Sequence, residues 1–202
     1  SLQRSIFDTE DRYNRGLEME NEIAAILKES INTKEKSLGL VGDIKDAAEA
    51  MIKTYKNGGK IIFFGNGGSA TDAQHLAAEL VGKFQINRGP LRAISLTTNT
   101  SILTSIGNDL SFDEIFSRQV EAITDSTDLV IGMSTTGNSK NVINGILAAK
   151  RKGAKTIGLT GEKGGKLANI VDLVLKVPSN STPRIQEVHI TIGHILCYLV
   201  ES

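Results

Sequence analysis

The sequence predicts an α/β fold in which a parallel β-sheet is covered by helices on both faces. Two observations predict it. From Lys60 onward, short apolar runs alternate with stretches of helical periodicity. Each apolar run is too short for a helix and is bounded by Gly, Ser, Thr or Asn, which is typical of buried strands. Because parallel neighbours need a crossover connection, this alternation indicates one sheet between two helical layers.

The N-terminal part, residues 1–57, lacks strand signals and is predicted to form two helices. The first, over about residues 5–30, is the more polar. In the second, apolar residues recur three and four positions apart from Leu40 to Tyr55, and the sequence Asn57-Gly58-Gly59 ends it.

The elements that follow are five strands and six helices. The strands are predicted at 60–64, 93–96, 128–133, 155–160 and 173–177. Helices are predicted near 69–83, 99–106, 112–123, 139–152 and 164–170, with a last helix that starts at Thr182-Pro183. Apolar residues occupy most of the circumference of this last helix, which indicates burial on more than one side. We therefore expect an oligomer in which N- and C-terminal helices pack between subunits, or else one thickly packed core.

Composition narrows the class of protein. The 202 residues include 23 basic and 23 acidic side chains, so the formal net charge is zero. Proteins that bind nucleic acid or anionic membranes usually carry a basic excess, so we expect neither partner. No apolar run approaches the roughly 18 residues of a membrane span. The single cysteine, Cys197, excludes an intrachain disulfide framework, and we expect a cytoplasmic protein.

Two loops are candidate anion sites. The sequence FGNGGS, ending at Ser69, joins the first strand to a helix, where glycines and a helix N-terminus expose backbone amides. It has neither the dinucleotide-binding nor the Walker spacing. The sequence GMSTTGNS, residues 132–139, follows the third strand and carries four hydroxyls. Either loop alone could be an ordinary capped turn, but ligands bind at such strand ends. Since neither contains Lys or Arg, a single phosphate on a small metabolite fits best.

Two helices carry candidate catalytic groups. Asp72, His75 and Glu79 follow the glycine-rich loop, with His75 and Glu79 on one face. A solvated surface pair is the alternative, but the apolar neighbours favour partial burial. On the last helix, Gln186 and His194 lie about 12 Å apart along an ideal axis, so one metal ion could hardly be bound by both from a straight helix.

These segments occur in order, and at matching spacing, in a known family. They are GNGGS at 65–69, DAQH at 72–75, EL at 79–80, SIGND at 105–109, FSRQV at 116–120, residues 134–139, and RIQE at 184–187 with His194. From about residue 35 to its end the chain resembles the phosphoheptose isomerases, enzymes with a sugar isomerase (SIS) domain.

The resemblance implies a three-layer α/β/α sandwich with a five-stranded, flavodoxin-like parallel sheet. It implies a single SIS domain over 1–202, in which the helices of 1–57 pack in the oligomer and 58–202 form the α/β core and C-terminal helix. It also implies a homotetramer with active sites at subunit contacts. The implied activity is aldose–ketose isomerisation of sedoheptulose 7-phosphate to D-glycero-D-manno-heptose 7-phosphate through a cis-enediol, for bacterial lipopolysaccharide or capsule.

The resemblance also assigns roles to residues. Glu79 matches the catalytic base and His194 its partner acid/base. A set that binds one zinc ion per site in some members corresponds to His75, Glu79, Gln186 and His194. The substrate-binding positions, most of them around the phosphate, correspond to Asn66, Gly67, Gly68, Ser69, Asp109, Ser134, Thr135, Thr136, Ser139 and Gln186. Two positions depart from the family: Thr136 replaces a common Ser, and Pro183 replaces a substrate-contacting Asp.

The chemistry agrees with these roles. Moving a proton between C1 and C2 needs one group at carbon and another at oxygen, for which a carboxylate and an imidazole are suitable. A carboxylate that binds zinc tightly is a poorer base, so the acid–base role of Glu79 ranks above the metal role. A site at a subunit contact would let Gln186 and His194 come from different copies of the chain.

Two other functions remain open. A relative in this fold class acts as a tetrameric scaffold that binds the bacterial replication initiator, without the need for an acid–base pair. Retention of His75, Glu79, Gln186 and His194 together favours an enzyme. The second is a different sugar-phosphate isomerase or a sugar-phosphate sensor.

Overall fold

The computed structural model describes residues 9–202, so the part of the first predicted helix before Thr9 lies outside the described residues. One five-stranded parallel sheet has the strand order β2-β1-β3-β4-β5. The strands are β1 (Ile61–Gly65), β2 (Ala93–Ser95), β3 (Leu129–Met133), β4 (Lys155–Gly161) and β5 (Leu173–Val177). This order is the flavodoxin-like one, and the predicted sheet is confirmed.

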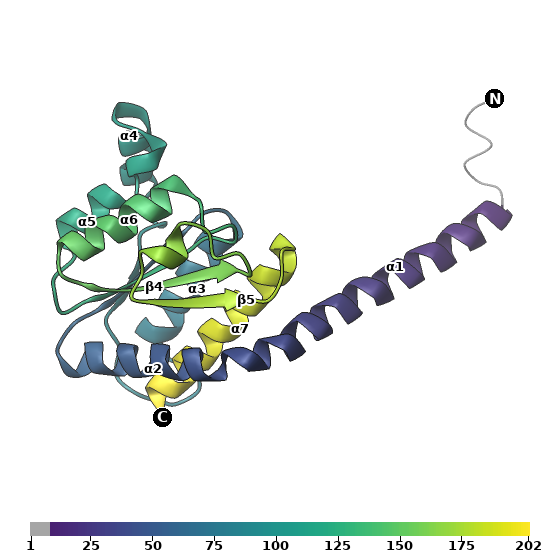
Figure 1. The fold of residues 1–202 in the computed structure, drawn as a ribbon, viewed down its shortest axis with the longest axis horizontal. Coiled ribbons are helices and arrows are strands. Elements are labelled where there is room, and N and C mark those ends of the chain that lie inside the picture. The colour runs from purple at the N-terminus through teal and green to yellow at the C-terminus, as the bar shows by residue number, and fades with distance from the viewer. Residues whose placement is uncertain (1–8) are drawn as a thin grey trace.

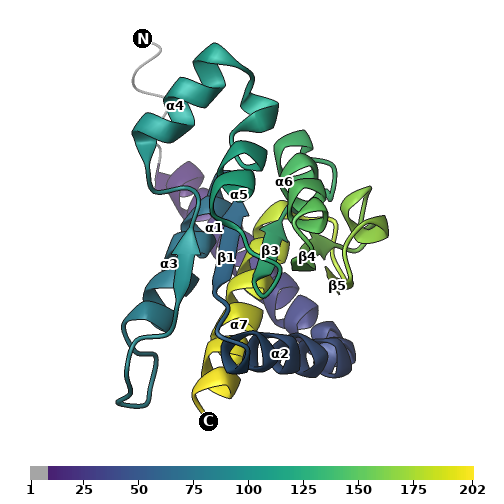
Figure 2. The ribbon, with the colours of Figure 1, turned by 90° about the vertical axis from the view of Figure 1, so that its left-hand side faces the viewer.

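Helices cover both faces of the sheet (Figure 1). The α-helices are α1 (Thr9–Lys36), α2 (Val41–Lys56), α3 (Gly68–Val81), α4 (Thr100–Asp109), α5 (Ser117–Ile123), α6 (Lys140–Arg151) and α7 (Thr182–Glu201). One core lies between the sheet and α2, α3 and α7, and a second lies between the opposite face and α5 and α6. Helix α4 projects beyond the end of α5 (Figure 2). The three-layer sandwich is therefore confirmed.

Three predicted helices differ most in extent. The first continues to Lys36, and a 3₁₀ turn (η2, Ser37–Leu40) joins it to α2. The predicted helix at 112–123 is split into a 3₁₀ turn (η3, Phe112–Glu114), capped by the Ser111 hydroxyl, and α5. The predicted helix at 164–170 is only a 3₁₀ turn (η4, Leu167–Asn169), because Gly164 and Gly165 have φ angles of 70° and 58°, outside the helical region.

Helix α7 packs tightly against α3 and the sheet. Ile185, Val188, Ile192 and Leu196 are buried in the core. At Gly193 the two helices are so close that a Cβ atom would lie 2.4 Å from Cδ2 of Leu76. The other side of α7 leaves Ile195, Tyr198 and Leu199 exposed, so a single chain does not bury the helix all round.

Helix α1 extends away from the rest of the molecule (Figure 1). Its C-terminal half touches α7: the Ser30 hydroxyl donates to Glu187 at 2.7 Å, and Arg184 donates to the carbonyl of Ile26 at 3.1 Å. On this same half of α1, Ile23 and Leu27 are more than half exposed, at 55% and 59%. Within residues 9–202, none of the helices combines the length and hydropathy that crossing a membrane requires.

Candidate active site

The two predicted anion loops lie side by side at the carboxyl end of the sheet. Strands β1 and β3 are direct neighbours, with Gly65 opposite Met133. The side-chain amides of Asn66, in the first loop, and Asn141, in the first turn of α6 after the second loop, exchange two hydrogen bonds of 2.9 and 2.8 Å. In the second loop the Ser134 and Ser139 hydroxyls are 3.0 Å apart. The parallel pairing of the two strands therefore brings together loops far apart in the sequence.

The hydroxyls of this region differ in accessibility. Ser69 and Ser134 are buried, Thr135 and Ser139 are half-buried, and Thr136 is exposed, where its hydroxyl accepts from the backbone N–H of Asn138 at 3.2 Å. The glycine loop turns into α3 at Gly67, whose φ of 55° favours glycine, and Gly68 opens the helix. Backbone amides and hydroxyls thus converge where α3 begins.

The loop at 134–139 is braced by the segment that follows β4. Gly137, with φ of 67°, approaches that segment so closely that a Cβ atom would lie 1.9 Å from the Gly164 carbonyl oxygen. The backbone N–H of Leu167 donates to the Gly137 carbonyl at 2.9 Å, and that of Lys166 donates to the Asn138 side chain at 3.1 Å. These two hydrogen bonds and the close approach at Gly137 therefore fix the hydroxyl-rich loop.

A cavity of about 220 Å³ opens beside this loop. Thr135 and Thr136 line one wall, and Lys163 and Thr182 contribute from the segment after β4 and the start of α7. Sequence reasoning missed Lys163 because neither anion loop contains a cation. Its position at the carboxyl end of β4 is the signal that could have found it, since that end of the sheet is where ligands bind.

A second group, which we call the histidine–glutamate cluster, consists of His75, Glu79 and His194. Nε2 of His75 lies 3.1 Å from Oε1 of Glu79, one helical turn further along α3. His194 reaches them from α7, and its ring meets that of His75 edge to face, with centroids 4.9 Å apart. One ligand atom from each residue lies within 4.8 Å of the others, and Glu79 and His194 are half-buried.

Two neighbours complete the surroundings of this cluster. The Phe84 ring stacks on His194, with centroids 5.3 Å apart and 27° between the planes. Asp72 lies on α3 one turn before His75. Burial raises the pKa of Asp72 to about 6, although the nearby His75 lowers it in part. Among residues 9–202, the buried Oδ2 of Asp72 and the buried Nε2 of His194 have no hydrogen-bond partner.

The remaining predicted site residues lie elsewhere in this chain. Gln186 packs against the start of α3: a Cβ atom on Gly68 would lie 2.6 Å from its Nε2 atom. It therefore lies at the glycine loop, while His194 lies further along α3. Asp109 is exposed at the end of α4, where its carboxylate accepts from the Asn108 side chain at 2.8 Å. Pro183 is exposed in the first turn of α7.

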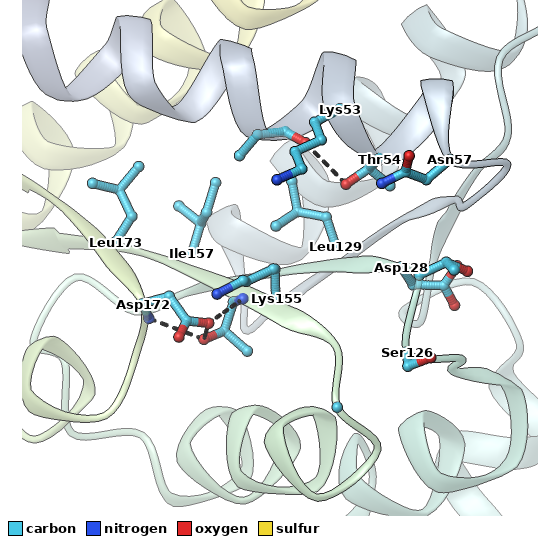
Figure 3. Close-up of a pocket in the computed structure, with 14 residues that line it drawn as sticks. Lys53, Thr54, Asn57, Ser126, Asp128, Leu129, Lys155, Ile157, Asp172 and Leu173 are labelled. Atoms are coloured by element: carbon cyan, nitrogen blue, oxygen red, sulfur yellow. Dashed lines mark hydrogen bonds between the residues drawn. The ribbon is translucent and has the colours of Figure 1, made fainter.

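Another cavity, of about 440 Å³, lies at the opposite, amino end of the sheet (Figure 3). Its two carboxylates are engaged in structural contacts. Asp172 accepts from the backbone and the hydroxyl of Thr156, both at 2.8 Å, and Asp128 accepts from the backbone of Lys60 at 2.9 Å. None of the predicted site residues lines this cavity. The candidate active site therefore lies at the carboxyl ends of the strands and along α3 and α7.

Comparison with known proteins gives one consistent result. The family model for the SIS domain matches residues 20–161. A phosphoheptose isomerase of Thermodesulfovibrio yellowstonii is 50% identical over 187 residues, 92% of this chain and 93% of that protein. One from Geobacter sulfurreducens is 57% identical over 163 residues, 81% of this chain and 86% of that protein.

Solved structures agree. The phosphoheptose isomerase of Neisseria gonorrhoeae superimposes with a TM-score of 0.86 at 44% identity, covering 91% of this chain and 98% of that one. The enzyme of that name from Francisella tularensis gives 0.86 at 36% identity, covering 89% and 96%. The similarity in sequence and in fold therefore extends over nearly the whole chain.

Proposed function

The chain belongs to the phosphoheptose isomerases, enzymes of the SIS domain family, and we propose that it interconverts sedoheptulose 7-phosphate and D-glycero-D-manno-heptose 7-phosphate. The observation that carries the proposal is the histidine–glutamate cluster, in which a half-buried carboxylate and two imidazoles meet from α3 and α7. The relatives' name supplies the class of substrate, a phosphorylated heptose. At about half identity they are named isomerases, and no finding supports the alternative scaffold function.

The proposed mechanism uses Glu79 as the base and His194 as the partner acid/base. Glu79 would take the proton from C1 of the ketose, which leaves a cis-enediol, and return it at C2. His194 would move a proton between the C2 and C1 oxygens, so that the ketone becomes a hydroxyl and the C1 hydroxyl becomes the aldehyde. General acid–base catalysis of this kind contributes roughly 10²- to 10⁴-fold in rate.

The donor set of the cluster fits zinc, which prefers nitrogen and oxygen ligands of this kind. His75, Glu79 and His194 would hold the ion, and the partnerless Nε2 of His194 supports a ligand there. Gln186 is the fourth proposed ligand; since it lies at Gly68 in its own chain, a copy from another subunit would have to supply it. A bound zinc ion would polarise the substrate carbonyl as a Lewis acid.

The phosphate would be held by the two anion loops, through Ser69, Ser134, Thr136 and Ser139. In one chain, Ser69 and Glu79 lie on α3 about 15 Å apart along its axis, by a rise of 1.5 Å per residue. This separation supports an active site at a subunit contact, where the loops of one chain face Glu79 of another. The exposed apolar side chains of α1 and α7 support the homotetramer that such sites require.

The proposal extends to the cell. We place the enzyme in the cytoplasm, consistent with a single, buried, unpaired cysteine. Its product would feed the synthesis of a surface heptose polymer, lipopolysaccharide or capsule.

The test is an isomerisation assay on sedoheptulose 7-phosphate. The wild type should turn over, while Glu79→Gln and His194→Gln should each lose at least about 10²-fold in kcat. Glu121→Gln, which removes only a surface ion pair with Arg151, serves as the matched control and should be unaffected. Full activity of both site variants would overturn the mechanism. An inactive wild type would overturn the function and favour the scaffold.

A further inference from the structure

We propose that Arg88 and Glu201 form a buried clamp that positions Phe84 and His194 for catalysis. We call the segment that follows α3, residues 82–92, the 82–92 loop. The clamp joins this loop to the ends of α3 and α7. The effect on the isomerisation rate rests on the proposed function, whereas the effect on the position of the His194 ring does not.

Glu201 is the last residue of α7, and its carboxylate is completely buried. It accepts three backbone hydrogen bonds from the 82–92 loop, from Phe84 at 2.6 Å, Gln85 at 2.8 Å and Ile86 at 3.0 Å. Burial opposes the charged form of this carboxylate, but the three N–H donors and Arg88 outweigh it and lower the pKa of Glu201 to about 2. An ionised carboxylate therefore holds the loop at Phe84.

Arg88 connects the same carboxylate to α3. Its Nη2 atom lies 2.7 Å from Oε1 of Glu201 and donates to the carbonyl of Glu79 at 3.1 Å. Its Nη1 atom donates to the carbonyls of Leu80 and Gly89, at 2.9 and 3.0 Å. Carbonyls at a helix C-terminus lack partners within the helix, so the guanidinium satisfies them at the turn that carries Glu79.

The clamp therefore holds three parts of the candidate site together. It binds the backbone of Glu79, the backbone of Phe84, and the end of the helix that carries His194. Phe84 in turn stacks on the His194 ring, and both line a hollow of about 300 Å³ beside the cluster. Catalytic groups misplaced by about 1 Å can lose up to 10²-fold in rate, so a clamp that fixes both helices and the stacking ring bears directly on turnover.

The Phe84 ring offers a direct measurement of the arrangement. An aromatic ring stacked on an imidazole shifts the imidazole proton resonances upfield. The chain has three histidines, so their ring signals can be assigned by substitution. His189, fully buried between α7 and the sheet, serves as the internal reference.

The experiment compares full-length wild type, Glu201→Gln, Phe84→Leu and the control Glu121→Gln. Ring proton NMR is recorded for all four proteins in the same buffer at the same pH. Phe84→Leu keeps the clamp but removes the ring, so its His194 shift gives the value for a lost stack. In Glu201→Gln we expect the His194 signals to move downfield toward that value, with His189 unchanged. In both variants kcat should fall about 10-fold with KM within about twofold, at temperatures where circular dichroism shows folded protein.

Each outcome has one meaning. Unmoved His194 signals in folded Glu201→Gln would overturn the clamp as a positioning device. Moved signals with an unchanged kcat, in an active enzyme, would overturn its part in catalysis. If Glu201→Gln does not fold, Arg88→Lys, which keeps the charge but loses the forked donors, takes its place with the same expected shifts. An inactive wild type would refute the proposed function, while the NMR comparison would still test the clamp.

Discussion

His75 and His194 meet edge to face, with ring centroids 4.9 Å apart and 78° between the planes, although one lies on α3 and the other on α7. This contact requires the two helices to lie close together, and Gly193 allows that, because a side chain at position 193 would collide with Leu76. Residues far apart in the sequence thus form one cluster through helix packing.

The first prediction concerns the phosphate. Ser139→Ala should raise KM for the sugar phosphate about 10- to 100-fold with little change in kcat, because a hydrogen bond to a charged group contributes about 1.5–3 kcal/mol. Initial rates over a range of substrate concentrations provide the measurement. Ser126→Ala, at the amino end of the sheet, is the control. Equal KM values in the two variants would show that Ser139 does not bind the phosphate.

The second prediction concerns zinc. His75→Asn removes an imidazole from the histidine–glutamate cluster, so at a free zinc concentration that saturates the wild type it should retain little metal. Elemental analysis after equilibrium dialysis measures the zinc per chain. Glu121→Gln should match the wild type. Retention of the full wild-type zinc content by His75→Asn would remove this residue from the proposed ligand set.

The third prediction concerns pH. Burial lowers the pKa of His189 from 6.5 to about 4, and the contact with the Thr160 carbonyl offsets this only in part. The unfolded chain therefore takes up a proton near pH 6.5, whereas the folded chain does so only near pH 4. The stability that the neutral His189 ring contributes is complete above pH 6.5 and is lost as the pH falls toward 4. The slope is at most about 1.4 kcal/mol per pH unit. Urea unfolding should show a shallower slope in His189→Gln, and identical slopes would contradict the prediction.

The fourth prediction concerns assembly. Leu27 on α1 is 59% exposed, and Ile23 and Ile31, one turn before and after it, extend the same apolar face. Leu27→Lys should shift the protein from the proposed tetramer toward smaller species in light scattering, and its activity should fall because the proposed sites lie at subunit contacts. Leu147→Lys, an exposed apolar residue on α6, is the matched control. A tetramer unaffected by Leu27→Lys would exclude this face from the interface.

The sheet was predictable because each strand is a short apolar run bounded by turn residues, and all five strands agree with the predicted ranges to one residue at each end. Short helices were less predictable. The spacing of residues in 164–170 predicted a helix, but Gly164 and Gly165 adopt positive φ angles and pack against Gly137. That contact is a tertiary one, which a local sequence pattern does not contain.

The candidate site was predictable in part. The pairing of His75 with Glu79 follows from helical spacing alone. The stacking of Phe84 on His194 and the contacts of Arg88 with α3 depend on how the 82–92 loop folds back, and its sequence has no periodicity that would indicate this. The position of Gln186 could not be settled from spacing, which made it hard for Gln186 and His194 of one straight helix to bind one ion. In this chain Gln186 lies at Gly68.

The contact between Gly137 and Gly164 has a consequence for how this protein can change. With 1.9 Å between a hypothetical Cβ on Gly137 and the Gly164 carbonyl oxygen, a substitution at Gly137 must be matched by rebuilding the loop that contains Gly164. The backbones of Thr135 and Thr136 lie under a similar constraint, because Cβ atoms on Gly161 and Gly165 would lie 2.8 and 2.5 Å from their carbonyl oxygens. Redesign of the enzyme for a different sugar phosphate would therefore leave these glycines untouched.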